Sequence, residues 1–319
     1  MQIFCYLFIS LFVVNAQALI IGNKSTAGEE KSLCRIIYRN QKGELLSTCS
    51  GTLVSSTKIL TAKHCLEKAP TVSVECGYIG EEGASKTEMT TGGSKVMTKG
   101  LKFIETHTDI VINKDHKGAN QVKNDLGVIE LKSPINPDSI KPSLFKPNSV
   151  YDYFTNVGAP FDGPTPPEIR NDSECKMEGF GINNEGLSGT LHSAPVASFL
   201  NIDQSQILAG EEYITKNLSP KKRRMINTCV GNYNESLLPE DIIPLAKRLH
   251  EEMMFDSVLA PGDSGGPLLC RKKGTLPWTI VAVATAVSLS KLSQSSVGAV
   301  STWQVLNQKD CIDLGISER

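Results

Sequence analysis

Residues 262–268 are Gly262-Asp263-Ser264-Gly265-Gly266-Pro267-Leu268, the stretch that most strongly decides the fold class. A serine hydroxyl is a poor nucleophile, so it needs a neighbouring base and donors that stabilise an oxyanion. Glycines on both sides of Ser264 allow a backbone turn that points N–H groups into the space beside the hydroxyl. The alternative is a glycine-rich loop without chemistry, and the following Gly-Pro-Leu-Leu-Cys makes that alternative weaker. We therefore expect Ser264 to be a nucleophile.

Two shorter motifs contain the partners that a nucleophilic serine needs. His64 belongs to the run Leu60-Thr61-Ala62-Lys63-His64-Cys65, at the end of a predicted strand and next to a cysteine. Asp125 begins a strand-like, largely apolar run over 125–131. Alone, such a histidine is most often a surface or core residue, and such an aspartate a turn residue. Together with Ser264 they match a general base and the acid that orients it.

The order His64, Asp125, Ser264, with these flanking residues, resembles the chymotrypsin/trypsin family of serine endopeptidases. That family has TAAHC around its histidine, a motif similar to NDIALLKL around its aspartate, and GDSGGPL around its serine. Subtilisins and α/β-hydrolases use the same chemistry in a different chain order. The resemblance extends from about Ile20 to the C-terminus, with a poor match inside 182–257.

The resemblance implies a role for each motif residue. Ser264 would attack the peptide carbonyl, His64 would act as general base and then general acid, and Asp125 would orient His64. The backbone N–H groups of Gly262 and Ser264 would form the oxyanion hole. Lys63 replaces an alanine of the family motif, and we expect its side chain to face solvent. We expect neither a cofactor nor a metal ion.

Short strands separated by turn signals predict an all-β fold. Residues 34–62 match a hairpin that continues as a meander. A helical pattern over 237–254 contains Pro239 near its start and acidic residues in its first turn. We expect this helix to lie in a surface insertion near 182–257, since long insertions concentrate in loops.

The resemblance implies two six-stranded antiparallel Greek-key barrels with the catalytic residues between them. The protease domain is expected at 19–319, with the first barrel at about 20–145 and the second at about 146–319. The composition fits a folded domain, because 319 residues include 33 Lys+Arg, 34 Asp+Glu and 40% hydrophobic residues. The net charge of -1 lacks the basic excess expected of a nucleic-acid-binding protein.

The N-terminus indicates export from the cell. Residues 3–14 are almost continuously apolar and precede Ala16-Gln17-Ala18, a cleavage pattern of the A-x-A type. The apolar run is too short to span a bilayer as a helix, so residues 1–18 are predicted to be a signal peptide. The run is not preceded by Lys or Arg, and a buried strand or an uncleaved anchor is the alternative. The mature protein is therefore expected to be secreted, extracellular or periplasmic, without membrane contact.

Eight cysteines remain after removal of residues 1–18, and none of them forms a CxxC. An even number in an exported protein favours disulfides over a metal site. The resemblance implies one disulfide behind His64 and one in the second barrel, and four cysteines then remain. The expected pairs are Cys49–Cys65, Cys175–Cys270, Cys34–Cys76 between neighbouring strands, and Cys229–Cys311.

Activation is where this chain departs from the family pattern. Family members begin their active chain with Ile-Val-Gly-Gly, cut after a basic residue, and the new amine pairs with the aspartate before the nucleophile, here Asp263. This chain has Ile20-Ile21-Gly22-Asn23 with no Lys or Arg upstream. A buried Asp263 without its partner would be strongly destabilised. We predict that the active form starts at Ile20 after removal of Leu19, without a trypsin-type zymogen cut, and a start at Ile36 is the alternative.

Substrate preference is predicted from the residues that match the family's specificity pocket. The floor position, six residues before the nucleophile, is Val258, and the wall matches Thr285-Ala286-Val287. Val287 in place of a glycine would make the pocket shallow and apolar, which favours Ala, Val or Leu before the cut bond. Ala260 replaces the cysteine of the family's disulfide beside the pocket. Rearranged loops, or a register slip that brings in Asp256, are the alternatives.

Two functions are consistent with these observations. The first is a secreted serine endopeptidase that acts as a monomer on protein or peptide substrates. The second is a catalytically silent member of the family that serves in binding or adhesion. Silent relatives generally lose a triad residue, whereas His64, Asp125 and Ser264 are all present. The sequence therefore favours the enzyme.

Overall fold

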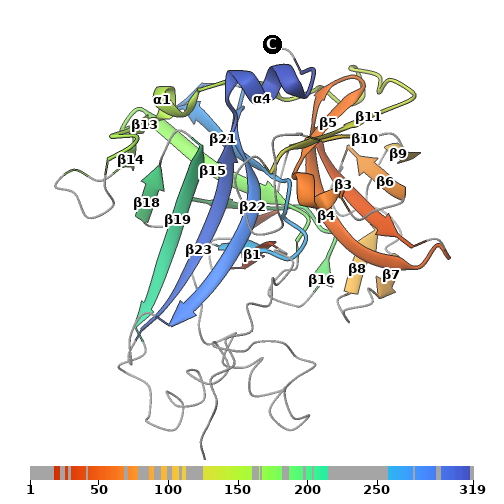
Figure 1. Cartoon of the computed structure of the whole chain (residues 1–319), viewed down its shortest axis with the longest axis horizontal. Helices are drawn as coiled ribbons and strands as arrows, with labels where there is room; N and C mark the ends of the chain where they lie inside the picture. The colour runs from red at the N-terminus through yellow and green to blue at the C-terminus, as the bar shows by residue number, and fades with distance from the viewer. Residues whose placement is uncertain are drawn as a thin grey trace, which may run out of the picture.

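The computed structural model of the chain describes most residues outside the first seventeen and 215–257. The described residues are 18–21, 26–27, 30–40, 42–67, 71–77, 86–89, 95–98, 103–107, 110–112, 125–159, 165, 167–181, 187–196, 199–202, 205–214, 258–275, 277–291 and 296–316. They form mostly strands, with a few short helices (Figure 1). The all-β prediction is therefore confirmed.

The first half of the chain forms an antiparallel sheet of seven strands. Neighbouring strands in this sheet are often consecutive in the chain, as expected for a meander. In spatial order the strands are β10 (Ile110–Ile112), β11 (Gly127–Glu130), β5 (Lys58–Thr61), β4 (Leu45–Ser55), β3 (Leu33–Arg39), β6 (Thr71–Cys76) and β9 (Phe103–His107).

The second half forms a sheet of nine strands beside the first (Figure 1). In spatial order its strands are β18 (Phe199–Ile202), β19 (Gln206–Ile214), β23 (Ser296–Val305), β22 (Thr279–Lys291), β21 (Pro267–Lys272), β15 (Ser173–Gly179), β17 (His192–Pro195) and β2 (Thr26–Ala27), with β12 (Leu144–Phe145) parallel to β22. Both sheets contain more strands than the six predicted for each barrel. The second sheet has additional strands because two short segments also pair with it. Strand β2 pairs with β17, and β12 pairs with β22.

Three small sheets complete the described strands. They are β1 (Ala18–Ile21) with β20 (Val258–Ala260), β13 (Phe154–Thr155) with β14 (Glu168–Ile169), and β16 (Leu187–Ser188) with β8 (Lys95–Thr98) and β7 (Lys86–Met89). Within the described ranges, the helical elements are η1 (Lys63–Cys65), α1 (Val150–Tyr153) and α4 (Gln308–Asp313).

The hairpin predicted after Cys34 is present as β3 and β4. Its turn forms around Asn40, whose side-chain oxygen accepts hydrogen bonds from the N–H groups of Lys42 and Glu44, both at 2.9 Å. Gly43 has a φ of +79°, a conformation that glycine adopts without steric cost. Local turn chemistry therefore sets the register that places Cys49 on β4.

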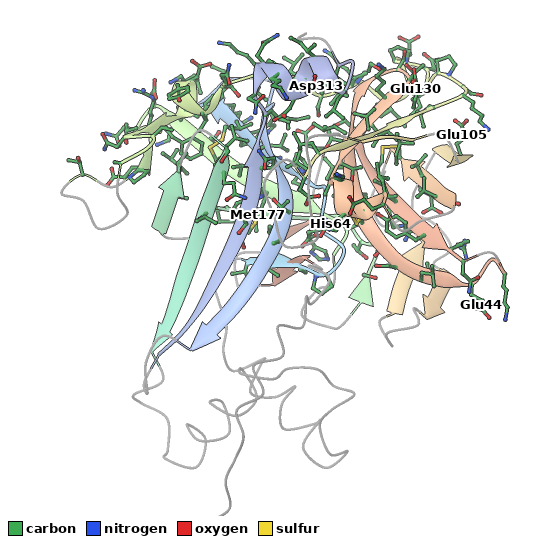
Figure 2. The ribbon with its side chains drawn as sticks, viewed as in Figure 1. Glu44, His64, Glu105, Glu130, Met177 and Asp313 are labelled. Atoms are coloured by element: carbon green, nitrogen blue, oxygen red, sulfur yellow. A yellow bond between two sulfur atoms is a disulfide. The ribbon has the colours of Figure 1, made fainter. Side chains whose placement is uncertain are left out.

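Two large hydrophobic clusters form the core. The first lies inside the seven-stranded sheet and includes Leu53, Ile59 and Val128. It also includes Leu314 and Ile316, at and just beyond the end of α4, so the C-terminal segment covers the first sheet. The second lies on the nine-stranded sheet and includes Met177, Trp303 and other residues of β15 to β23 (Figure 2). These apolar contacts hold both sheets in place around the site.

The predicted insertion near 182–257 begins with strands. Within its described part, β17, β18 and β19 belong to the nine-stranded sheet. The helix predicted over 237–254 lies outside the described residues. Among the residues that the structure describes, no helix has the length and apolar character needed to cross a bilayer.

Candidate active site

The fold places His64 where the two sheets meet (Figure 2). Strand β5 ends at Thr61, and the chain then turns through η1, which carries His64 and Cys65. A disulfide joins Cys65 to Cys49 on β4. The 3-10 turn and the disulfide together fix the backbone on both sides of the imidazole.

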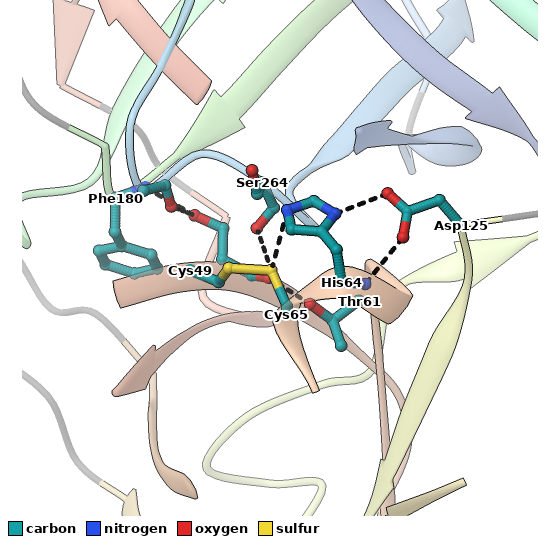
Figure 3. The surroundings of a disulfide bond; sticks show 9 residues. Cys49, Thr61, His64, Cys65, Asp125, Phe180 and Ser264 are labelled. Carbon is teal, nitrogen blue, oxygen red and sulfur yellow. Dashed lines mark hydrogen bonds and ion pairs between the residues drawn. A yellow bond between two sulfur atoms is a disulfide. The ribbon is translucent and has the colours of Figure 1, made fainter. Parts of the chain in front are cut away.

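Asp125 holds His64 through two hydrogen bonds (Figure 3). The backbone N–H of His64 donates to Asp125 Oδ1 at 2.8 Å, and the Nδ1 atom lies 2.6 Å from Asp125 Oδ2. Because a carboxylate only accepts, Nδ1 carries the hydrogen and Nε2 is the basic nitrogen of the neutral ring. Asp125 is 5% exposed, while the side chain of His64 is 31% exposed. The buried acid thus orients an imidazole that solvent and ligands can reach.

Ser264 lies beside the imidazole, on the side away from Asp125 (Figure 3). It belongs to the turn between β20 and β21. Cys65 Sγ lies 3.7 Å from His64 Nε2 and 3.6 Å from the carbonyl oxygen of Ser264. The structure therefore brings together the three residues that the motifs predict, from three separate parts of the chain.

The backbone around Ser264 requires glycine on both sides. Gly262 and Gly265 have φ values of +104° and +83°, which L side chains rarely adopt. A Cβ on Gly265 would lie 2.0 Å from Thr61 Oγ1 and 2.2 Å from the carbonyl oxygen of Ser50. The second half of the chain packs directly against β4 and β5 at this point, and only glycine leaves room for that contact.

The carboxylate of Asp263 is fully buried behind this turn. Its Oδ1 accepts a hydrogen bond from the N–H of Gly181, and its Oδ2 accepts one from the N–H of Ala260, both at 2.7 Å. A Cβ on Gly179 would lie 2.1 Å from Asp263 Oδ1, and one on Gly181 would lie 2.6 Å from both carboxylate oxygens. Two glycines therefore make the space in which Asp263 sits.

Ser50 on β4 connects the first sheet to the turn that carries Ser264. Its side chain donates a hydrogen bond to the carbonyl oxygen of Gly262 at 2.8 Å and accepts one from the N–H of Phe180 at 2.9 Å. Its own N–H donates to the carbonyl oxygen of Ser264 at 2.8 Å. None of the sequence motifs predicted a role for Ser50. Its position next to Cys49, which was expected behind His64, was the one available signal.

The side chain of Lys63 does not face solvent, contrary to the prediction. It is 5% exposed, and its Nζ lies 3.2 Å from Glu67 Oε1, one helical turn further along the chain. The long aliphatic stem is covered while the charge reaches a carboxylate that is itself partly exposed. The solvent-facing prediction is therefore wrong, because the helical turn that begins at η1 brings Glu67 within reach of this side chain.

Three of the predicted disulfides are present: Cys34–Cys76, Cys49–Cys65 and Cys175–Cys270. Cys34 and Cys76 are directly opposite each other on β3 and β6, as expected for neighbouring strands. For the fourth pair, Cys311 is buried in the first cluster, and Cys229 lies outside the described residues. Cys49, His64 and Cys65 place possible metal ligands within 4.8 Å of one another, but the two sulfurs are bonded to each other.

A buried acid lies next to the Asp263 site. Glu178 on β15 is 1% exposed, and burial raises the pKa of its carboxyl above the usual value of 4.5. Lys176 Nζ lies 2.6 Å from Glu178 Oε1 and 3.9 Å from Glu30 Oε1. The N–H of Glu30 donates to Glu178 Oε2 at 3.4 Å. Glu178 therefore attaches the segment before β3 to the strand that leads to Gly179.

The residues predicted to form the specificity pocket lie on β20 and β22. Val258 and Thr285 are buried, whereas Ala286 and Val287 are half-buried. Thr285 is the extra residue of a bulge between β22 and β23, and its hydroxyl donates to the carbonyl oxygen of Thr302 at 3.2 Å. Val287 packs against the second cluster. The predicted wall of the specificity pocket therefore begins at a β-bulge.

The predicted new N-terminus lies close to the Asp263 segment. In the intact chain Ile20 belongs to β1, where it pairs with Leu259, and the neighbouring Leu19 pairs with Ala260. Ala260 is the residue whose N–H contacts the Asp263 carboxylate. Ile20 is thus connected to Asp263, the predicted partner of its amine, through the single strand β20.

Similarity to known proteins shows the family of this chain. The family model described as Trypsin matches residues 20–233. The chain belongs to the trypsin family. The matched range contains His64 and Asp125 and ends before Ser264. The assignment of Ser264 as the serine of the family motif therefore depends on the sequence around it and on its position beside His64.

One curated relative of this trypsin family member is "Ovochymase" from Halocynthia roretzi. The two are 22% identical over 239 residues, which cover 74% of this chain and 11% of the relative. The chain thus corresponds to about a tenth of that protein. This likeness adds to the family assignment.

Proposed function

We propose that this trypsin family member is a secreted serine endopeptidase whose catalytic residues are Ser264, His64 and Asp125. The observation that carries the proposal is the pair of hydrogen bonds from His64 to Asp125, at 2.8 and 2.6 Å, with Ser264 on the other side of the ring. A hydrogen-bonded base next to a serine between glycines is the arrangement that activates a weak nucleophile.

In the proposed mechanism, Ser264 Oγ attacks the carbonyl carbon of the substrate peptide while its proton moves to His64 Nε2. Asp125 stabilises the imidazolium that forms. His64 then gives the proton to the leaving amine as the C–N bond breaks, which leaves an acyl group on Ser264. Water repeats the sequence with His64 as base, and Ser264 is released together with the carboxylate product.

The proposed oxyanion hole consists of the N–H groups of Gly262 and Ser264. The positive φ of Gly262 and the fixed turn around Ser264 support this assignment, because preorganised donors stabilise developing negative charge without reorganisation. No cofactor or metal is needed for these steps.

We further propose that the active form begins at Ile20, whose amine would approach the buried Asp263. The pairing of β1 with β20 supports this, since it places Ile20 next to the Asp263 segment. The rival start at Ile36 would cut β3 in its middle, where Ile36 pairs with both β4 and β6 and is fully buried. N-terminal sequencing of active protein tests this, and a start at Leu19 or Ile36 would overturn it.

For substrates, we propose a preference for Ala, Val or Leu before the cut bond. The apolar side chain of Val258 at the expected floor supports a pocket without a charge. Profiling with a peptide library tests the preference. Dominant cleavage after Arg or Lys would contradict an uncharged floor, and dominant cleavage after Phe or Tyr would contradict a shallow pocket.

A fluorophosphonate probe tests the catalytic proposal itself. The probe should label mature wild-type protein at Ser264, and labelling should disappear in Ser264→Ala. A folded protein that starts at Ile20 and remains unlabelled would instead support the silent binding or adhesion protein. The three disulfides are consistent with an oxidising, extracellular or periplasmic location. Size-exclusion chromatography tests the expected monomer.

A further inference from the structure

We infer that Ser50 is a positioning residue that holds the oxyanion-hole turn from the opposite sheet, an inference that rests on the roles proposed for Gly262 and Ser264. Ser50 lies on β4 of the first sheet, immediately after Cys49, and is fully buried. The turn that carries Ser264 belongs to the second half of the chain. Ser50 is thus a contact between the two halves at the point where the proposed chemistry takes place.

The side-chain hydroxyl of Ser50 joins two segments that are far away in sequence. It donates to the carbonyl oxygen of Gly262, 212 residues away, at 2.8 Å. It accepts from the N–H of Phe180, 130 residues away, at 2.9 Å. Phe180 lies between Gly179 and Gly181, the two glycines that leave space for the Asp263 carboxylate. One hydroxyl therefore connects the oxyanion-hole turn to the segment that holds the Asp263 carboxylate.

The backbone of Ser50 is fixed as well. Its N–H donates to the carbonyl oxygen of Ser264 at 2.8 Å, and its carbonyl oxygen accepts from Thr61 Oγ1 at 2.7 Å. Thr61 ends the strand that leads into η1 and His64. The same residue thus contacts the nucleophile turn and the strand that leads to the base, so it can set the distance between them.

The hydrogen bonds of Ser50 restrain the turn that contains the two proposed oxyanion donors. The two proposed oxyanion donors are the N–H groups of Gly262 and Ser264, and the carbonyl groups of these same two residues accept hydrogen bonds from Ser50. Gly262 has a φ of +104°, and a glycine has few steric restraints of its own. The orientation of the Gly262 peptide groups therefore depends on external hydrogen bonds, and the Ser50 hydroxyl supplies one of them.

Removal of the hydroxyl should change catalysis more than substrate binding. In Ser50→Ala, the carbonyl oxygen of Gly262 and the N–H of Phe180 lose a buried partner, and the turn shifts to reduce this loss. A shifted donor stabilises the transition state less, while contacts to the ground-state substrate stay the same. Complete loss of an oxyanion donor lowers kcat by about a hundredfold to a thousandfold, so a displaced donor should lower it by about tenfold to a hundredfold with KM nearly unchanged.

The experiment compares Ser50→Ala with Ser32→Ala in the mature chain. Ser32 is a matched control, because it is 2% exposed and its hydroxyl is hydrogen-bonded to the Ser143 hydroxyl at 2.6 Å. Three quantities are measured: kcat and KM on a peptide substrate, the midpoint of urea unfolding, and hydrogen exchange of the backbone amides at Phe180 and in 262–264. Ser50→Gly, which also removes the hydroxyl and should give the same changes, is the second variant if Ser50→Ala does not fold.

The expected result is a fall in kcat and faster exchange at Phe180 and 262–264 in Ser50→Ala, with neither change in Ser32→Ala at a similar loss of stability. Unchanged exchange at these amides, or a kcat no lower than that of Ser32→Ala, would overturn the inference. If wild-type protein shows neither activity nor fluorophosphonate labelling, the proposed function fails. In that case the exchange measurement still decides whether Ser50 holds the turn.

Discussion

Replacement of Gly179 by alanine should disrupt the Asp263 site without any change to a catalytic side chain. The added Cβ would lie 2.1 Å from Asp263 Oδ1 and 2.8 Å from its Cγ. Gly179 is the last residue of β15 and pairs with β17, so its backbone has little freedom to retreat. Asp263 is fully buried, and its carboxylate must therefore leave its present position.

The magnitude follows from the contacts that this movement breaks. The carboxylate accepts hydrogen bonds from the N–H groups of Gly181 and Ala260, both at 2.7 Å. Hydrogen bonds to charged groups contribute about 1.5–3 kcal/mol each, so the loss of both costs about 3–6 kcal/mol. That is a large part of the ~5–15 kcal/mol by which ordinary domains are stable.

Urea unfolding, followed by the fluorescence of the two tryptophans, measures this loss. Gly43→Ala is the matched control, because Gly43 has a φ of +79° and nothing lies within 4 Å of an added Cβ. It should cost only the left-handed backbone penalty of about 1–2 kcal/mol. Gly179→Ala should also slow fluorophosphonate labelling, since Asp263 adjoins Ser264. A Gly179→Ala protein as stable as Gly43→Ala, and labelled at the wild-type rate, would refute this account of the Asp263 site.

Three further predictions concern separate parts of the molecule. Asp125→Asn should lower kcat by about 10⁴-fold with little change in stability, because an amide no longer selects the Nδ1–H tautomer of His64, and wild-type kcat would contradict the proposed role. Burial raises the pKa of Glu178, so its contribution to stability is present below about pH 4.5 and is lost as the pH rises through the raised pKa. Glu178→Gln should remove that part of the pH dependence of urea unfolding, and an unchanged profile would show that Glu178 is not its source. Replacement of Cys34 and Cys76 by alanine opens a loop of 42 residues and should cost about 4 kcal/mol in the same assay, whereas a loss below about 1 kcal/mol would contradict the entropic estimate.

The sequence alone determined the features of this protein that depend on motifs of neighbouring residues. The residues around His64, Asp125 and Ser264 indicated both the family and the all-β fold. The turn signals within 34–62 predicted the first hairpin, because turn chemistry acts over a few neighbouring residues. Paired cysteines and the family resemblance together led to three disulfides that the structure contains.

The tertiary structure decided what depends on the packing of the two sheets. The burial of Lys63, the space that Gly179 and Gly181 leave for Asp263, and the contacts of Ser50 with Gly262 became visible only there. Each of the last two joins residues that lie tens to hundreds of positions apart in the chain. A local pattern shows which polar groups a segment contains, but their hydrogen-bond partners are chosen when distant segments are packed together and water is excluded.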